Sequence, residues 1–226
     1  MYHTSIRPPY QFHHPLLYCY IAFIILGAIA LATLEHGAGI LFFSTYRNPI
    51  VDNLFRYWTL LGEEMAYLVA IILLCFVKFR LAIFIPVIGV VVTLVAHTLK
   101  SFFAQPRPRL YYEMHGLLEQ INFIDGVVLH AGATSFPSGH TMSAFALYSF
   151  VALCLLRRRW LSIFLFIIAF GVGLSRVVLV QHFLRDIYVG GIIGGGIAIL
   201  LFYAQTLLSY APHLWWNKQF SCHAKT

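Results

Sequence analysis

Long apolar runs alternate with short polar segments along most of the chain. Six of these runs approach the ~20 residues that a helix needs to cross the hydrocarbon core of a membrane. They cover residues 16–34, 57–77, 81–99, 140–156, 161–180 and 187–208. The pattern predicts an all-α fold, an integral membrane bundle of six transmembrane helices, in a single domain over residues 1–226.

The composition supports a membrane protein, since 60% of the residues are hydrophobic and only 10% are charged. The first apolar run ends in Ala30-Leu31-Ala32, which is similar to a signal-peptide cleavage site. Its apolar region is longer than the ~7 to 15 residues of such peptides. We therefore expect this segment to be retained as an anchor.

The net charge of +7 raises the question of an acidic partner. The sequence has no basic tract flanked by solvated residues and no zinc-finger or single-strand-binding pattern, which disfavours nucleic acid. A phosphorylated membrane lipid is the expected acidic partner. The cysteines show neither a disulfide framework nor metal-ligand spacing, because three lie in apolar runs and one in the tail: Cys19, Cys75, Cys154 and Cys222.

Basic residues in short loops predict the orientation of the bundle. The connections after the second and fourth runs and both chain ends carry such residues: Arg7, Lys78, Arg80, Arg157, Arg158, Arg159, Lys218 and Lys225. This side, with both termini, is predicted to be cytoplasmic. The compact chain without an N-glycosylation sequon favours a bacterial inner membrane, with the opposite face toward the periplasm or exterior.

The opposite face receives the longest polar connection, residues 100–139, which is long enough to form a lid over a site. It also receives four basic residues against the positive-inside rule: Lys100, Arg107, Arg176 and Arg185. Any one of them could extend its charge to the membrane surface from a helix end. Four together, beside histidines, indicate a functional site.

Three segments on this face, within residues 100–186, carry groups suited to phosphate. Lys100 supplies a point charge, and Arg107 and Arg176 supply planar donor forks that match phosphate oxygens. Ser138 and Gly139 precede a predicted helix, so their backbone N–H groups and the positive helix end are expected to face an anion.

Two histidines and a carboxylate complete this constellation. His182 and Asp186 are four residues apart, which places them on one helical face if the sixth helix begins there. Asp186 can then fix the imidazole tautomer and leave the other nitrogen as a nucleophile. A local hydrogen bond or half of a metal site is the alternative for this pair. His140 is expected on the same face, where it can protonate a leaving oxygen.

The combination resembles the type-2 phosphatidic acid phosphatase family, which shares its active site with vanadium haloperoxidases. The first sequence pattern of the family, a lysine followed by six residues and Arg-Pro, matches Lys100 to Pro108. Pro-Ser-Gly-His is met by residues 137–140, and Ser-Arg, five residues, His, three residues and Asp by Ser175 to Asp186. Six spanning helices are similar to the membrane branch of this family.

The resemblance implies a role for each matched residue. His182 would attack phosphorus, Asp186 would orient it, and His140 would protonate the leaving oxygen before water releases phosphate. The phosphate would be bound by Lys100, Arg107, Ser138, Gly139 and Arg176. The resemblance implies no metal and no cofactor, so we expect the activity to survive chelation.

The implied activity is hydrolysis of a lipid phosphate or diphosphate on the non-cytoplasmic face. Candidate substrates are undecaprenyl diphosphate, phosphatidylglycerol phosphate, phosphatidic acid and lipid A. A phosphotransferase that uses the same phosphoenzyme is the alternative. A non-enzymatic lipid-binding or transport protein should lack some of His140, His182 and Asp186, which are all present here. A haloperoxidase is disfavoured, because those relatives are soluble and this chain is predicted to lie in a membrane. The oligomeric state stays open.

Several further residues keep two interpretations. Glu63 and Glu64 interrupt the second apolar run and either pair with a site arginine or mark a hydrated helix end. Arg109 and Arg185 either meet a second phosphate or headgroup or remain solvated. In the sixth run, glycines repeat at four-residue spacing, which indicates close helix packing within the chain, with a dimer interface as the alternative: Gly190, Gly194, Gly191 and Gly195.

Overall fold

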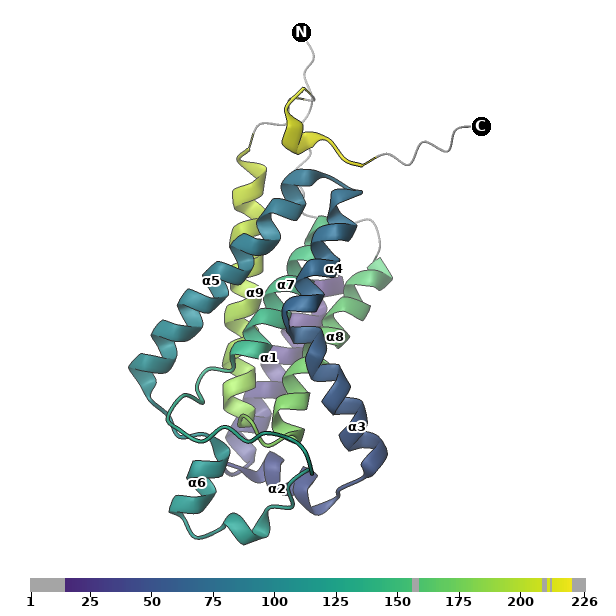
Figure 1. The fold of residues 1–226 in the computed structure, drawn as a ribbon. Helices are drawn as coiled ribbons and strands as arrows, with labels where there is room; N and C mark the ends of the chain where they lie inside the picture. Colours follow the sequence, from purple (N-terminus) through teal and green to yellow (C-terminus); the bar gives the residue numbers. More distant parts are fainter. Residues whose placement is uncertain (1–14, 156–158, 209–210, 212, 221–226) are drawn as a thin grey trace.

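The computed structural model is an all-helical bundle, and it describes residues 15–155, 159–208, 211 and 213–220. Its long helices are α1 (Pro15–Thr33), α4 (Glu64–Cys75), α5 (Phe79–Phe103), α7 (Gly139–Cys154), α8 (Arg159–Val178) and α9 (Leu184–Thr206). Shorter elements are α2 (Ala38–Thr45), α3 (Pro49–Trp58), η1 (Thr59–Gly62), α6 (Pro108–Met114), η2 (Leu118–Gln120) and η3 (Trp215–Asn217). Figure 1 shows the long helices side by side, with α2 and α6 at the lower end.

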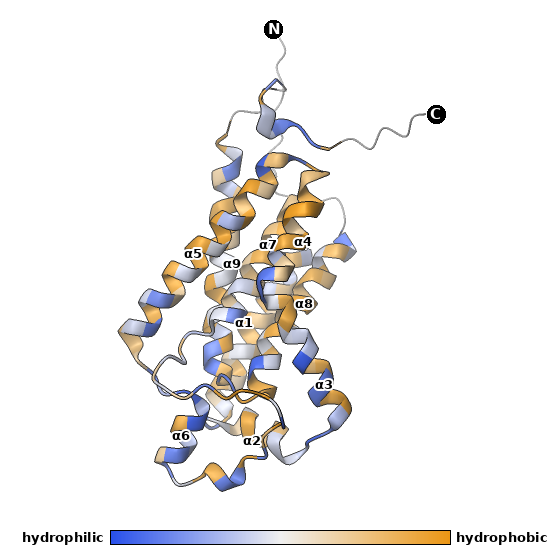
Figure 2. Ribbon diagram, in the orientation of Figure 1, coloured by the Kyte–Doolittle hydropathy of each residue, from blue (hydrophilic) through white to orange (hydrophobic). Residues whose placement is uncertain are grey.

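Four helices, α1, α5, α8 and α9, are long and apolar enough to cross a membrane. Large apolar side chains on them face outward, such as Leu26 (65% exposed) and Leu94 (62% exposed). Figure 2 shows hydrophobic residues over α4, α5 and α8, and more hydrophilic ones in α3 and α6. An outer surface of this kind suits lipid rather than water, so the chain is an integral membrane protein.

The other two predicted spans differ from regular membrane helices. The run at residues 57–77 forms η1 and α4, and a break at Glu63 bends the pair formed by Pro49–Gly62 and Glu64–Cys75 by 55°. Helix α7 has 16 residues, about 24 Å at 1.5 Å per residue, which is shorter than the ~30 Å hydrocarbon core. The expectation of six regular spans is therefore met only in part: four continuous helices, one bent pair and one short helix.

Helix α7 can be short because it is the centre of the bundle. It packs against α5, α8 and α9, and its middle is almost entirely buried, as at Phe145 and Phe150. A helix that other helices surround does not need to match the thickness of the bilayer. Small residues allow the close packing: a methyl group at Gly190 would lie 2.8 Å from the Ser138 carbonyl oxygen, and one at Gly191 would lie 2.8 Å from Phe23. The glycine rows of α9 thus pack within the chain, as the sequence indicates.

The two ends of the bundle differ. The backbone N–H of Phe79 donates to the Lys218 carbonyl, and that of Phe220 donates to the Cys75 carbonyl, so the segment after α9 packs on the α4–α5 turn. In Figure 1 this end is at the top. Arg80, expected in a loop, is instead buried in the first turn of α5. The predicted basic residues Arg7, Arg157, Arg158 and Lys225 lie outside the described residues.

Candidate active site

The three motifs meet at the end of the bundle opposite the α4–α5 turn. There the last turn of α5, the first turn of α7 and the α8–α9 turn come together beneath the connection of residues 104–138 (Figure 1). Short elements α2, α3 and α6, which the apolar pattern does not predict, flank this end. The polar connection is therefore partly helical and covers the motifs.

Arg107 is held by the far end of that connection. Helix α5 ends at Phe103, because Ala104 adopts a left-handed conformation (φ 44°) and prolines follow. The Arg107 backbone N–H donates to the Gly132 carbonyl at 2.8 Å, and its Nε donates to Thr134 Oγ1 at 3.2 Å. Both bonds leave the terminal guanidinium nitrogens available, and buried Nη1 has no hydrogen-bond partner among the described residues.

Ser138 is the N-cap of α7. Its hydroxyl oxygen accepts hydrogen bonds from the Thr141 hydroxyl at 2.8 Å and the Thr141 N–H at 3.4 Å. Its own backbone N–H donates to the Asp186 carbonyl at 3.0 Å. The expectation that the Ser138 N–H faces an anion is therefore wrong, because that group already joins motif two to motif three. The Lys100 ammonium instead lies over the helix end, 3.5 Å from where a methyl group on Gly139 would be.

His182 lies in a tight turn rather than on a helix. Helix α8 ends at Val178, Val180 adopts a left-handed conformation (φ 57°), and α9 begins at Leu184. The Arg176 carbonyl accepts the backbone N–H groups of Gln181 at 2.8 Å and His182 at 3.0 Å. The expectation of one helical face is wrong, yet the expected contact forms, with His182 Nδ1 3.3 Å from Asp186 Oδ2.

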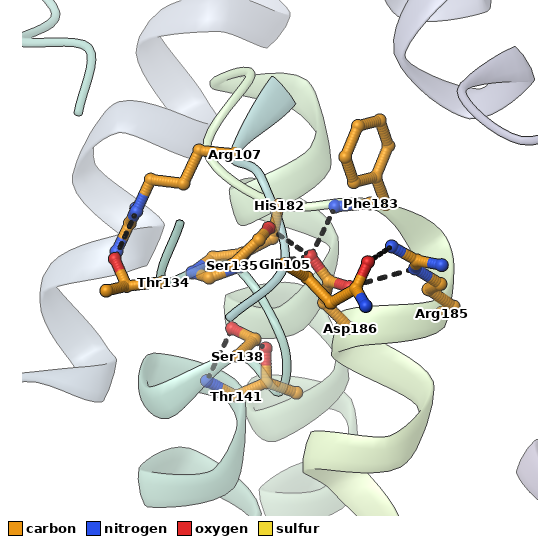
Figure 3. A network of polar contacts seen from close by, with 10 residues as sticks. All are labelled: Gln105, Arg107, Thr134, Ser135, Ser138, Thr141, His182, Phe183, Arg185 and Asp186. Carbon is orange, nitrogen blue, oxygen red and sulfur yellow. Dashed lines mark hydrogen bonds and ion pairs between the residues drawn. The ribbon is translucent and has the colours of Figure 1, made fainter. Parts of the chain in front are cut away.

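Asp186 collects donors from two further groups (Figure 3). Its Oδ2 accepts the Phe183 backbone N–H at 3.0 Å and the Ser135 hydroxyl at 2.5 Å. Ser135 Oγ also lies 3.5 Å from His182 Nδ1. Sequence reasoning missed Ser135, whose only signal is its place two residues before Pro-Ser-Gly-His. The carboxylate is fully buried, so its position is fixed by these bonds.

Burial sets the protonation of His182. It lowers the pKa of the imidazole to about 4, against an opposing hydrogen bond and charge from Asp186 and with the nearby Arg176 and Arg107 adding to the decrease. The ring is 1% exposed. At neutral pH the imidazole is uncharged, which is the form that can act as a nucleophile.

Arg176 reaches the site from inside α8. The residue is 7% exposed, and its guanidinium Nη1 donates to the hydroxyl of buried Thr59 at 2.8 Å. Its Nε, like Arg107 Nη1, is buried and has no hydrogen-bond partner in the described part of the chain. Unpaired buried donors are costly, so the two guanidinium groups are suited to an anion that accepts from both.

His140 faces a cavity beside this centre. The cavity has a volume of 570 Å³ and lies between the η1–α4 break, α5 and α7, with Lys100, Gly139 and His140 in its wall. Glu63 and Glu64 line the same cavity, and Glu63 Oε1 lies 3.6 Å from His140 Nε2. Glu63 thus pairs with a site histidine, and its charge also acts on the site arginine Arg176, as one of the two interpretations from the sequence expects.

The two arginines that adjoin the motifs, Arg109 and Arg185, have different surroundings. Arg185 Nη2 donates to Gln105 Oε1 at 3.1 Å, and its Nε lies 3.5 Å from Asp186 Oδ1 (Figure 3). Arg109 is exposed on α6. Within the described ranges, no group of three His, Cys, Asp or Glu side chains converges as metal ligands do.

The fold and site define an all-helical membrane protein in which cationic side chains surround a buried His–Asp pair. Residues 80–209, more than half of the chain, match the PAP2 superfamily. The chain belongs to this superfamily, which confirms the resemblance to the type-2 phosphatidic acid phosphatases.

Similar proteins include lipid phosphatases. A stretch of 64 residues is 44% identical to the lipid A 4′-phosphatase of Bacteroides thetaiotaomicron and covers 28% of each chain, so it spans under a third of that relative. The crystal structure of Aquifex aeolicus LpxE is similar with a TM-score of 0.61 and 27% identity, over 73% of this chain and 92% of that chain. A transmembrane PAP2 type phosphatidylglycerolphosphate phosphatase from Bacillus subtilis shares the fold, with a TM-score of 0.61 and 21% identity, over 87% and 98%.

Proposed function

We propose that the chain is a lipid phosphatase that acts through a phosphohistidine on His182. The observation that carries this proposal is the buried, neutral imidazole held through Nδ1 by Asp186, beside guanidinium nitrogens of Arg107 and Arg176 that have no hydrogen-bond partner among the described residues. A neutral nucleophile next to fixed cations is what attack on an anionic phosphate monoester requires.

The reaction has two steps. His182 Nε2 forms a bond to phosphorus while the bond from phosphorus to the lipid oxygen breaks, and His140 gives a proton to that oxygen. Asp186 stabilises the positive charge on the modified ring. Water then attacks phosphorus, His140 takes its proton, the N–P bond breaks, and His182 and inorganic phosphate are released. No metal or cofactor takes part in this scheme.

The phosphate is held by groups from all three motifs. Lys100, Arg107 and Arg176 supply positive charge, and Gly139 at the first turn of α7 supplies a helix N-terminus without a side chain. Ser138 acts indirectly, because its hydroxyl and N–H are already bonded to Thr141 and Asp186. Positioning and charge neutralisation then provide most of the rate enhancement.

The site is proposed to face the periplasm or exterior, with both termini cytoplasmic and six membrane crossings in a bacterial inner membrane. In support, the motifs lie at the end of the bundle opposite Lys78 and Lys218 (Figure 1). The bent pair, α3 and η1 with α4, and the short α7 would be two of the crossings. Accessibility of single cysteines to an impermeant thiol reagent in whole cells tests this orientation.

The substrate is proposed to be a phosphorylated membrane lipid, with lipid A, phosphatidylglycerol phosphate, phosphatidic acid and undecaprenyl diphosphate as candidates. The names of the similar proteins favour the first two. The cavity beside His140 offers space for a leaving group of substantial size. A phosphotransferase that passes the phosphoryl group to an alcohol is the alternative, and free phosphate released without an added acceptor argues against it.

The test is phosphate release by the purified protein from a panel of these lipids, with and without EDTA. We expect turnover that EDTA does not abolish, an acid-labile and alkali-stable phosphoenzyme, and loss of both in His182→Asn. The matched control is His213→Asn, an exposed histidine near the other end of the bundle. Full turnover in His182→Asn would refute the nucleophile, and complete loss with EDTA would refute the metal-free scheme.

A further inference from the structure

The second apolar segment breaks at Glu63, and the break is fixed to α7. Glu63 has an extended backbone (φ −105°, ψ −177°) between η1 and α4. The two carbonyls before it accept hydrogen bonds from α7 side chains: Ser143 Oγ donates to Gly62 at 3.2 Å and Tyr148 OH donates to Leu61 at 2.7 Å. These two hydrogen bonds therefore fix the position of Glu63 along the axis of α7.

At this position along α7, the carboxylate of Glu63 lies beside the side chain of His140. Ser143, which anchors the break, is one turn beyond His140 on the same helix. Gly62 lies close to both α7 and α8, because a methyl group there would lie 3.4 Å from the His140 carbonyl oxygen and 2.7 Å from Val172. Glu63 Oε1 lies 3.6 Å from His140 Nε2, just beyond hydrogen-bond length, and both side chains are 37% exposed to the cavity. Placing the Glu63 carboxylate within an apolar segment costs free energy, and ionisable residues kept at such positions are often functional. The contact between Glu63 and His140 therefore calls for a functional explanation.

The charged groups around His140 explain why a carboxylate is placed beside its ring. The charged and titratable groups that face it or line its cavity come from every neighbouring element: Lys100, Arg107, Arg176, His182, Glu63, Glu64, Tyr67 and His97. Three of these, Lys100, Arg107 and Arg176, are cations that act on the ring, and like charges disfavour an imidazolium. The Glu63 carboxylate, 3.6 Å from Nε2, supplies the opposite charge beside the ring.

We propose that Glu63 is a positioning residue that orients His140 and stabilises its protonated form for proton transfer to the leaving oxygen. This inference rests on the proposed function. Because Nε2 faces Glu63, the proton moves from His140 Nδ1 to the lipid oxygen as the bond from that oxygen to phosphorus breaks, and Glu63 gives and takes no proton in this step. The carboxylate then stabilises the imidazolium before the transfer and reorients the neutral ring after it.

The experiment compares two substrates with different leaving groups. An alkyl phosphate lipid needs a proton on its leaving oxygen, whereas a nitrophenyl phosphate does not. In Glu63→Gln we expect kcat/KM for the lipid to fall roughly tenfold, with its basic limb moved to lower pH, and kcat/KM for nitrophenyl phosphate to stay unchanged. Glu63→Asp should restore part of the loss. The control is Glu113→Gln, an exposed carboxylate on α6 outside this cavity, which should behave as wild type.

Three results would overturn the inference. Equal losses on both substrates would indicate a structural role, and the ratio between substrates does not depend on the fraction of protein that folds. Equal gains on both would indicate that Glu63 only repels phosphate. An unmoved basic limb would show that Glu63 does not act on the proton of His140. In each case an active wild type still supports the phosphatase, whereas an inactive wild type refutes both proposals.

Discussion

The backbone N–H of Ser138 donates to the backbone carbonyl of Asp186 at 3.0 Å. This bond ties the cap of α7 to the first turn of α9, so it links the helix end that we propose for phosphate binding to the residue whose carboxylate contacts His182. Gly190, one turn further along α9, permits the contact, because any side chain there would meet the Ser138 carbonyl.

Gly190→Ala is expected to separate the two helices. Its methyl group would lie 2.8 Å from the Ser138 oxygen, so α7 or α9 must shift and the Ser138–Asp186 bond must lengthen. Overpacking of this kind costs about 1 to 3 kcal/mol, and we expect phosphate release to fall roughly tenfold. The control is Gly196→Ala, where a methyl group meets nothing within 4 Å. Equal activity and thermal stability of the two variants would contradict this coupling.

Ser135→Ala removes the 2.5 Å hydrogen bond to Asp186 Oδ2 and leaves its other donors in place. The carboxylate can then rotate away from His182 Nδ1, so we expect kcat to fall roughly tenfold with little change in KM. Steady-state phosphate release measures both constants, with Ser101→Ala on the exposed end of α5 as the control. A change in KM alone would place Ser135 in binding rather than in orientation of the His–Asp pair.

Thr59→Val keeps the side-chain shape and removes the acceptor of Arg176 Nη1. A buried guanidinium nitrogen then loses its partner, which costs about 1 to 3 kcal/mol of stability in the absence of phosphate. We expect a higher KM, because the arginine fork is less well ordered, and a lower unfolding temperature that added phosphate or vanadate partly restores. Thr59→Ser should remain near wild type. An unchanged KM in Thr59→Val would show that Arg176 needs no such support.

The buried His182 predicts a pH dependence of stability. Its pKa is about 4 in the folded protein, against an ordinary value near 6.5, so the unfolded chain takes up a proton first as the pH falls. Stability from this group is full above about pH 6.5 and is lost progressively toward pH 4. Between pH 7 and pH 5 the loss amounts to about 2 kcal/mol. Unfolding in detergent should therefore depend less on pH in His182→Gln than in wild type, and parallel curves would contradict this assignment.

The sequence predicts the long elements well where a helix is both apolar and continuous. The run at residues 16–34 becomes α1 and that at 187–208 becomes α9, with small shifts at the ends. It does not predict α2, α3 and α6, because each is much shorter than the ~20-residue apolar run by which a membrane-spanning helix is recognised. The bend at Glu63 also needs the structure, since it depends on hydrogen bonds from α7.

The candidate site shows the same division. Motif spacing brings His140, His182, Asp186, Lys100, Arg107 and Arg176 to one end of the bundle, and their proposed roles await the experiments above. Spacing alone suggested a helical His182, whereas a left-handed residue at Val180 places it in a turn. Ser135 and Thr59 are absent from any motif, because a single hydroxyl in a loop or at a helix end carries no pattern of its own.

The sequence by itself determined the membrane environment, the all-helical class, the family and the set of charged residues that meet, because these follow from apolar run length and from residue identity at fixed spacing. Only the tertiary structure decided which donors remain unpaired, which carbonyl occupies the Ser138 N–H, and that Glu63 faces His140. Those relationships join segments far apart in the chain, and their geometry is set by how closely α7 packs against its neighbours.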